Sequence, residues 1–294
     1  MDIFSGIKKI EKKIRRRIVG YVKLKKRKLT KNNRMPFLQL HLADHCNLNC
    51  KGCAHFSPVA EKHLIDLDDL EKMYRNLQPF LETWFSRFEL MGGEPLLHPQ
   101  IEEILDMTRA YFPKMEIRLV TNGINLLEMN NSFFWNCAKN NIIVYISMYP
   151  IHLDYKAIYG KLDRYGVRHS RYGEYDICKT FINYRLNTQG CYNRKKNYQR
   201  CKLGGRCLQL KENRIYPCFS SAYAEHLNRY FHTGFEWEQG DYLSLDQPVT
   251  EEQFRNFINE PVPFCRYCDI KHQSTSEWGL SKKSASEWIS GRRE

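Results

Sequence analysis

Three cysteines lie close together near the start of the sequence: Cys46, Cys50 and Cys53. An apolar run comes directly before them, so their CxxxCxxC spacing predicts a short thiol loop at the end of a strand. A four-coordinate zinc or iron site closed by protein alone needs four ligands, and this loop supplies three. The loop therefore predicts an iron–sulfur cluster in which one iron stays open for another ligand.

A second group of thiols lies in the last third of the chain and consists of Cys201, Cys207, Cys218, Cys265 and Cys268. The first three surround a predicted hairpin that turns at residues 212–213, and the last two form a CxxC pair. Thiols brought together in this way suit a tetrahedral zinc ion or a cluster. Five thiols compete for four places, so Cys201 and Cys207 are alternatives for the first position, and Cys191 is a weaker candidate.

The remaining cysteines are Cys137, in an apolar helical context that predicts a core position, and Cys178, near the predicted end of the strand–helix region. A chain of 294 residues with 42% hydrophobic residues can build a large core without disulfides. No secretory signal is recognisable, because charges interrupt every apolar run near the N-terminus. We therefore expect reduced thiols, no membrane-spanning helix and a cytoplasmic protein.

Strands and helices alternate from Met35 onward. Strands are predicted at Phe37–Ala43, Arg87–Met91, Glu116–Thr121 and Ile142–Met148, and helices at Leu67–Phe85, capped by Asp66, and Ile101–Tyr111. This alternation predicts a parallel sheet, in which ligands bind at the carboxyl ends of the strands. The unusual segments all lie at such ends: the cysteine loop, Gly92-Gly93-Glu94-Pro95, Thr121-Asn122-Gly123 and Ser147. Together they predict one composite site.

The net charge of +13 is concentrated in residues 1–34, where fourteen lysines and arginines face Asp2 and Glu11. The rest of the chain is nearly neutral, so a basic nucleic-acid groove through its core is not predicted. Isoleucines recur at helical spacing within residues 1–34, which predicts a basic amphipathic helix. It could attach to an anionic membrane surface or pack on its own domain. RNA binding is not favoured, because no aromatic side chains alternate with the lysines.

The cysteine loop, followed about forty residues later by Gly-Gly-Glu-Pro and then by a strand-end Thr-Asn-Gly, resembles the radical S-adenosylmethionine enzyme superfamily from about Phe37 to Ile151. The resemblance implies a partial (β/α)6-type TIM barrel. It also implies a [4Fe–4S] cluster on Cys46, Cys50 and Cys53. The amino and carboxylate groups of S-adenosylmethionine would chelate the open iron of this cluster.

By the same resemblance Gly92, Gly93, Glu94 and Pro95 would meet the methionine amino group, and Asn122 and Ser147 would contact the nucleoside or carboxylate. The family commonly has an aromatic residue before the third cysteine, where this chain has Gly52. Phe56 is a candidate substitute, and no GxIxGxxE-like adenine segment is recognisable. The adenine contacts are therefore the least defined part of the predicted site.

The second thiol group resembles the C-terminal auxiliary-cluster domains of this superfamily, called SPASM or, in the shorter form, twitch. The expected organisation is a basic helix over residues 1–34, a core over 35–185, and a small cysteine-rich α+β domain over 186–294. The tail of this domain is predicted to be helical over residues 281–289 and to pack back on the body or form a lid. We expect a second [4Fe–4S] cluster there, with zinc as the alternative.

The resemblance implies an enzyme that takes one electron from a donor such as flavodoxin or ferredoxin, cleaves S-adenosylmethionine, and abstracts hydrogen from a C–H bond. An auxiliary cluster favours a net oxidation of an alcohol-bearing, sugar-like or lipid-linked glycan substrate. A peptide maturase is the alternative, disfavoured because residues 1–34 are too short for a peptide-clasping module. A non-catalytic iron–sulfur or zinc protein is the alternative of another class.

Overall fold

The computed structural model describes residues 35–171 and 177–291. The helix predicted over residues 1–34 lies outside this range. Contacts divide the chain into two units, Met1–Met35 and Pro36–Glu294, and the second unit holds all the elements described for this fold. No helix within the described part of the chain is long and apolar enough to cross a membrane.

Five parallel strands form the centre of the fold, and they follow the predicted order. They are β1 (Phe37–Ala43), β2 (Phe88–Gly92), β3 (Ile117–Thr121), β4 (Ile143–Ile146) and β5 (His169–Arg171), each paired with the next. The predicted strand at 142–148 is shorter than expected, and β5 was not predicted. Because the strands are parallel, their carboxyl ends meet at one edge, as the placement of the motifs requires.

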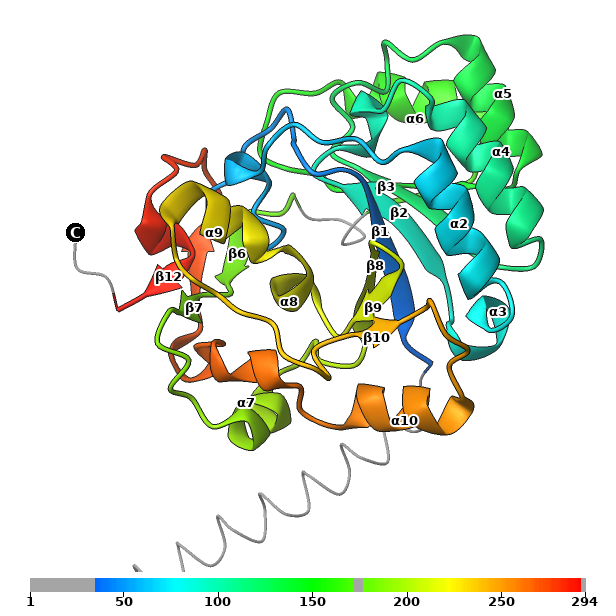
Figure 1. The fold of residues 1–294 in the computed structure, drawn as a ribbon. Helices are drawn as coiled ribbons and strands as arrows, with labels where there is room; N and C mark the ends of the chain where they lie inside the picture. The colour runs from blue at the N-terminus through cyan, green and yellow to red at the C-terminus, as the bar shows by residue number, and fades with distance from the viewer. Residues whose placement is uncertain (1–34, 172–176, 292–294) are drawn as a thin grey trace, which may run out of the picture. The chain divides into compact units, whose positions relative to one another are not determined.

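Helices connect these strands and lie along one side of the sheet (Figure 1). They are α2 (Leu67–Leu77), α3 (Leu81–Trp84), α4 (Ile101–Tyr111), α5 (Asn131–Lys139) and α6 (Tyr155–Arg164). The predicted cap is confirmed, because the Asp66 side chain accepts hydrogen bonds from the backbone of Asp68 and Asp69. The single helix predicted over Leu67–Phe85 is wrong in its middle, where Pro79 interrupts it; proline lacks the N–H that would continue the hydrogen-bond ladder.

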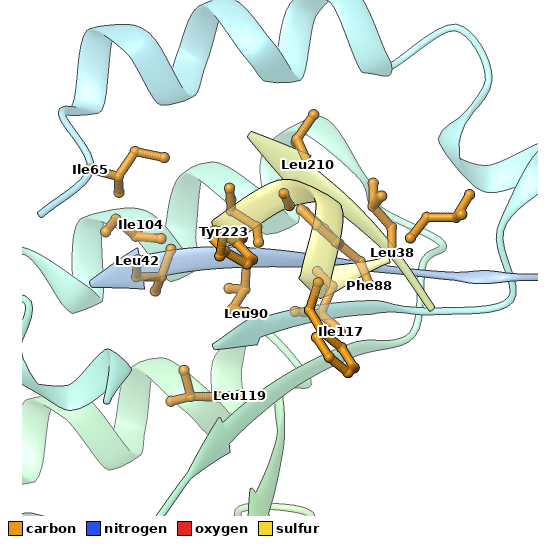
Figure 2. Close-up of a cluster of buried hydrophobic side chains, with 14 of the residues drawn as sticks. Leu38, Leu42, Ile65, Phe88, Leu90, Ile104, Ile117, Leu119, Leu210 and Tyr223 are labelled. Carbon is orange, nitrogen blue, oxygen red and sulfur yellow. The ribbon is translucent and has the colours of Figure 1, made fainter. Parts of the chain in front are cut away.

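The alternate side chains of the strands that face the helices build the core. Leu38 and Leu42 from β1, Phe88 and Leu90 from β2, and Ile117 and Leu119 from β3 lie together in Figure 2, and all six are fully buried. The residues between them face the opposite side of the sheet because strand side chains alternate. Polar residues at these positions therefore point away from the core helices.

The last third of the chain joins the same sheet. β8 (Cys207–Lys211) pairs in parallel with β1, and β9 (Arg214–Tyr216) and β10 (Leu243–Ser244) extend the sheet beyond it. The predicted hairpin turn is confirmed, because Glu212 and Asn213 have φ of 49° and 57°, as a two-residue turn of this type requires. Because β8 is bonded directly to the first strand, one sheet runs through both the early and the late parts of the chain.

Four helices complete this region: α7 (Arg194–Arg200), α8 (Phe219–Tyr223), α9 (Glu225–Phe231) and α10 (Glu251–Asn259). Figure 1 shows α8 on the side of the sheet opposite to α2 and α4. Its Tyr223 ring stacks on His41 of β1 with centroids 3.7 Å apart. This helix therefore helps to enclose the face of β1 that does not meet the core helices.

The C-terminal residues 274–290, here called the strap, pack on the cysteine loop. β11 (Ser274–Glu277) pairs with β6 (Thr180–Asn183), and β12 (Ile289–Ser290) pairs with β7 (Leu186–Asn187). Trp288 is 1% exposed, so the tail packs on the body as expected. The helix predicted over 281–289 is wrong: only Ala285–Glu287 forms a short 3₁₀ turn, because the backbone here is bonded to the cysteine loop and to Glu287.

Candidate active site

Cys46, Cys50 and Cys53 lie on the loop after β1 and face a common cavity of about 500 Å³. Gly92, Gly93, Asn122 and Ser147, from the ends of β2, β3 and β4, line the same cavity. The structure thus brings together seven of the nine residues predicted for this site; the other two, Glu94 and Pro95, do not line the cavity. A volume of this size is within the usual range for small-molecule and cofactor pockets.

The glycine pair at the end of β2 allows its loop to pack against the start of the cysteine loop. A Cβ on Gly92 would lie 2.1 Å from the carbonyl oxygen of Ala43, and one on Gly93 would lie 2.1 Å from that of His45. The Gly93 and Glu94 amides donate to the same two carbonyls, at 2.8 and 3.1 Å. Only glycine permits this approach, so the pair fixes the cysteine loop relative to β2.

Glu94, which is predicted to lie near the methionine amino group, is fully buried and does not line the cavity. It accepts hydrogen bonds from the Thr121 hydroxyl at 2.6 Å and from the amides of Asn122 and Leu96 at 2.9 and 3.1 Å. Burial raises the pKa of its carboxyl to about 7, against the lowering effect of these three bonds. Glu94 therefore holds the β3 loop in place.

Asn122 connects the β3 loop to the cysteine loop. Its side-chain amide donates to Asn47 Oδ1 at 2.8 Å and lies 3.7 Å from Cys46 Sγ. Ser147 is bonded through its backbone to the Thr121 carbonyl at 2.8 Å. Both residues are therefore held at the edge of the cavity by neighbouring strand ends.

Gly52, which precedes the third cysteine, has φ of +64°, and a Cβ there would lie 3.0 Å from Asn183 Oδ1. The space next to the loop is therefore filled by β6 instead of an aromatic side chain from the loop itself. Phe56 does not substitute for that aromatic, because it is fully buried and is not part of the cavity wall. The aromatic rings that line the cavity include Tyr145, Tyr149, Phe181, Tyr184, Phe37 and Phe219.

The environment of the three thiols disfavours their ionisation without a bound cation. Burial raises the pKa of Cys46 and Cys50 to about 12 and also raises the pKa of Cys53. Metal coordination deprotonates a thiol outright, so binding iron here would release protons. Three thiols on one cavity wall, with open space in front of them, fit the donor set of a cluster with one open iron.

The floor of the cavity is polar, which the sequence patterns did not lead us to expect. Gln209, Gln39, Glu89 and Arg118 are paired in register across β8, β1, β2 and β3, and we call them the polar row. All of them line the cavity except Gln209, which is fully buried. Gln39 Nε2 donates to Glu89 at 2.7 Å, and Gln209 Nε2 donates to Gln39 Oε1 at 2.7 Å. Arg87 Nε lies 2.5 Å from Glu89, and its guanidinium is 3.8 Å from the Phe37 ring centroid. The sequence does contain a pattern that would have predicted this row: polar residues at alternate positions of strands that are buried on both faces.

A carboxylate–imidazole cluster surrounds the buried Asp44, and of its histidines only His63 is largely exposed. His41 Nδ1 and His63 Nδ1 lie 2.9 and 3.1 Å from the Asp44 carboxylate, and His41 Nε2 lies 2.8 Å from His55 Nδ1. Burial acts to raise the pKa of Asp44, but the two imidazole hydrogen bonds outweigh it and hold the pKa well below its usual range. His226 lies 3.9 Å from the same carboxylate, and burial lowers its pKa to about 4.

The second thiol group also converges. Cys201, Cys218, Cys265 and Cys268 line one small pocket between α7, β9 and the segment after α10. Asn197 of α7 supports the CxxC pair, because its side chain donates to the carbonyls of Cys265 and Cys268 at 2.8 and 2.6 Å. Burial raises the pKa of Cys218 to about 11 and that of Cys265 to about 12. Four thiols around one pocket supply the number of ligands that a [4Fe–4S] cluster needs.

Cys207 does not belong to this pocket. It lines the first cavity, and its thiol donates to Gln39 Oε1 at 2.9 Å. The other three thiols also lie outside the second pocket. Cys137 is fully buried, as predicted, Cys191 is exposed, and Cys178 lines the first cavity. Among the described residues, no three His, Cys, Asp or Glu side chains are arranged so that they could hold a single metal ion.

Comparison with known proteins agrees with this arrangement. Residues 40–132 match the model of the Radical SAM superfamily. Domains of this superfamily carry a [4Fe–4S] cluster and bind S-adenosylmethionine. The match covers β1, the cysteine loop, β2 and β3, which position most of the cavity edge.

Individual relatives are similar over part of the chain. The GTP 3′,8-cyclase of Microcystis aeruginosa is 33% identical over 104 residues, covering 33% of this chain and 31% of the relative. The structure of BtrN in complex with AdoMet and 2-DOIA is 14% identical, covers 80% of this chain and 93% of its own, and has a TM-score of 0.48. SuiB of Streptococcus suis bound to S-adenosylmethionine is 19% identical, with coverages of 49% and 36% and a TM-score of 0.38. The chain spans about a third of the length of the curated relatives it matches.

Proposed function

We propose that this protein is a radical S-adenosylmethionine enzyme in which Cys46, Cys50 and Cys53 hold a [4Fe–4S] cluster. When bound and reduced by one electron, such a cluster supplies the electron that cleaves S-adenosylmethionine to methionine and a 5′-deoxyadenosyl radical, which abstracts hydrogen from a C–H bond. The observation that carries the proposal is the single cavity shared by the three thiols and the strand ends at Gly92, Asn122 and Ser147.

The remaining residues of the site would position the bound molecules. Glu94 holds the Asn122 loop, and Gly92 and Gly93 offer backbone groups that a methionine amino group can approach closely. The aromatic rings of the cavity wall would exclude water from the reacting groups. Tyr149 and Phe181 replace the missing loop aromatic as candidate contacts for adenine.

We propose a small, alcohol-bearing, sugar-like substrate, free or lipid-linked. Gln39, Glu89, Arg118 and Arg87 line the cavity with both donors and acceptors, which suits a hydroxyl-rich molecule better than an apolar one. A peptide substrate is the alternative.

We further propose that Cys201, Cys218, Cys265 and Cys268 hold a second [4Fe–4S] cluster of the twitch or SPASM type, with zinc as the alternative. The shared pocket and the support from Asn197 favour these four over a set that includes Cys207. When bound, such a cluster supplies an electron acceptor that favours net oxidation of the substrate.

The decisive experiment is anaerobic reconstitution with iron counting and a 5′-deoxyadenosine assay with dithionite as reductant. The wild type should produce 5′-deoxyadenosine, and the triple variant Cys46→Ala/Cys50→Ala/Cys53→Ala should produce none. Cys137→Ala, which alters a buried thiol outside both pockets, is the matched control and should retain activity. Iron-loaded wild type without cleavage would leave a non-catalytic iron–sulfur protein as the better description.

The proposed partners have separate tests. Flavodoxin or ferredoxin would replace dithionite as the electron donor in a cytoplasmic enzyme, and the same assay can measure this. A membrane role for residues 1–34 predicts that the full chain co-sediments with anionic vesicles more than with neutral ones.

A further inference from the structure

The strap packs along one side of the cysteine loop. Backbone hydrogen bonds join the two segments, although they are more than 200 residues apart in the sequence. The amide of Lys51 donates to the Gly279 carbonyl at 2.8 Å, and the amide of Ser281 donates to the Asn49 carbonyl at 2.8 Å. Cys50 and Leu280 form an antiparallel bridge. The loop is therefore held on one side by β2 and on the other by the strap.

One strap side chain reaches a thiol directly. Trp278 Nε1 donates a hydrogen bond to Cys50 Sγ at 3.3 Å, within the range for a bond to sulfur. Its indole ring stacks on Tyr149 with centroids 6.3 Å apart, and its backbone amide donates to the Lys179 carbonyl at 2.8 Å. Trp278 is not part of the cavity wall, so it acts behind Cys50 and not on a molecule in front of it.

A hydrogen bond to a cluster-ligating sulfur changes the balance between oxidation states. The reduced cluster carries one more negative charge, so a donor aimed at the sulfur stabilises it more than the oxidised form, and the reduction potential rises. The bond is stronger in a buried site than in water, and Cys50 is only 8% exposed.

We infer that Trp278 is a positioning residue that raises the reduction potential of the cluster held by Cys46, Cys50 and Cys53. The inference rests on the proposed ligation of that cluster. It assigns to the C-terminal strap a role in how readily the site accepts an electron, in addition to packing.

The test is a spectroscopic redox titration of the reconstituted protein, followed by electron paramagnetic resonance. Trp278→Phe retains an aromatic ring but removes the donor, and should shift the midpoint of the Cys46/Cys50/Cys53 cluster to a more negative potential at unchanged iron content. Trp288→Phe is the matched control, because Trp288 Nε1 donates to the Cys53 carbonyl oxygen and not to a sulfur. Its midpoint should equal that of the wild type.

A second variant separates the donor from the packing. Incorporation of benzothienylalanine at position 278 retains the shape of the indole but has no N–H, and should give the same negative shift as Trp278→Phe. A wild-type midpoint in this variant would overturn the inference, and so would an equal shift in Trp288→Phe. Wild-type protein without iron would overturn both the ligation and the inference, whereas iron with an unchanged midpoint would overturn the inference alone.

Discussion

At the scale of single residues, Gly52 explains how a chain can lack the aromatic residue commonly found before the third cysteine of this superfamily. Its positive φ and the contact with Asn183 leave no room for a side chain. Its amide also donates to Glu287 Oε2 at 3.0 Å. The loop is therefore supported by β6 and by the strap, and glycine is required for its positive φ and for the close approach to Asn183.

We expect Gly52→Ala to lower the free energy of unfolding by about 1–3 kcal/mol, because the new Cβ is strained at positive φ and crowds Asn183. Iron retention should fall with it. Urea denaturation and iron analysis measure the two effects. Gly160→Ala is the control: this glycine lies in α6 with no atom within 4 Å of an added Cβ, so the variant should gain about 0.5–1 kcal/mol. Equal effects at both positions would contradict the explanation.

His226 gives the fold a sensitivity to acid. Burial lowers its pKa from 6.5 to about 4, although the Asp44 and Glu225 carboxylates act to raise it. The unfolded chain therefore binds more protons than the folded one below about pH 6.5, and the stability that depends on neutral His226 is lost as the pH falls from there toward 4.

His226→Leu should remove this part of the pH dependence. Between pH 7 and pH 5 the wild type should lose about 2 kcal/mol more unfolding free energy than the variant, as linkage predicts for such a shift. Urea denaturation at several pH values measures the difference. The same slope in both proteins would show that His226 is protonated in the folded state over this range.

At the scale of elements, local sequence patterns were sufficient to predict the bounds of those strands and helices whose ends are set by neighbouring residues. The predicted bounds Phe37–Ala43 and Ile101–Tyr111 match β1 and α4, because the apolar run of the strand and Pro99 before the helix are local signals. The strap was not predictable in the same way. Its position depends on bonds between residues such as Lys51 and Gly279, which no local periodicity reveals, and its backbone follows those partners and not its own helix propensity.

Glu287 is the residue that should matter most for holding the strap in place. Its buried carboxylate accepts from the amides of Gly52, Lys282 and Ser284 at 3.0, 2.9 and 3.3 Å. In Glu287→Gln one acceptor oxygen becomes a donor, so we expect a loss of about 1–3 kcal/mol from the unpaired amides. Denaturation and iron retention check this, with Glu277→Gln, an exposed residue of β11, as the charge-matched control. Identical losses would indicate a general charge effect.

At the scale of the whole unit from Pro36 onward, the sheet connects the two thiol sites. The sequence predicted which thiols to consider but left Cys201 and Cys207 as alternatives, because both precede the same hairpin at short range. The pairing of β8 with β1 decides between them: it turns Cys207 toward Gln39 and the first cavity, and leaves Cys201 beside Cys218. The polar row arises from the same pairing, which explains why neither could be predicted from spacing alone.

This geometry gives a prediction that discriminates between the two thiols. If each site holds a [4Fe–4S] cluster, the wild type should contain about eight irons per chain, Cys201→Ala should contain about four, and Cys207→Ala should retain about eight. Cys207→Ala removes the thiol bonded to Gln39, so we expect it to affect 5′-deoxyadenosine formation, or its dependence on substrate, and not iron content. Loss of about four irons in Cys207→Ala alone would place that thiol in the second cluster. In that case β8 would have to rotate its alternate side chains, which would also break the polar row and expose the apolar residues Leu208 and Leu210.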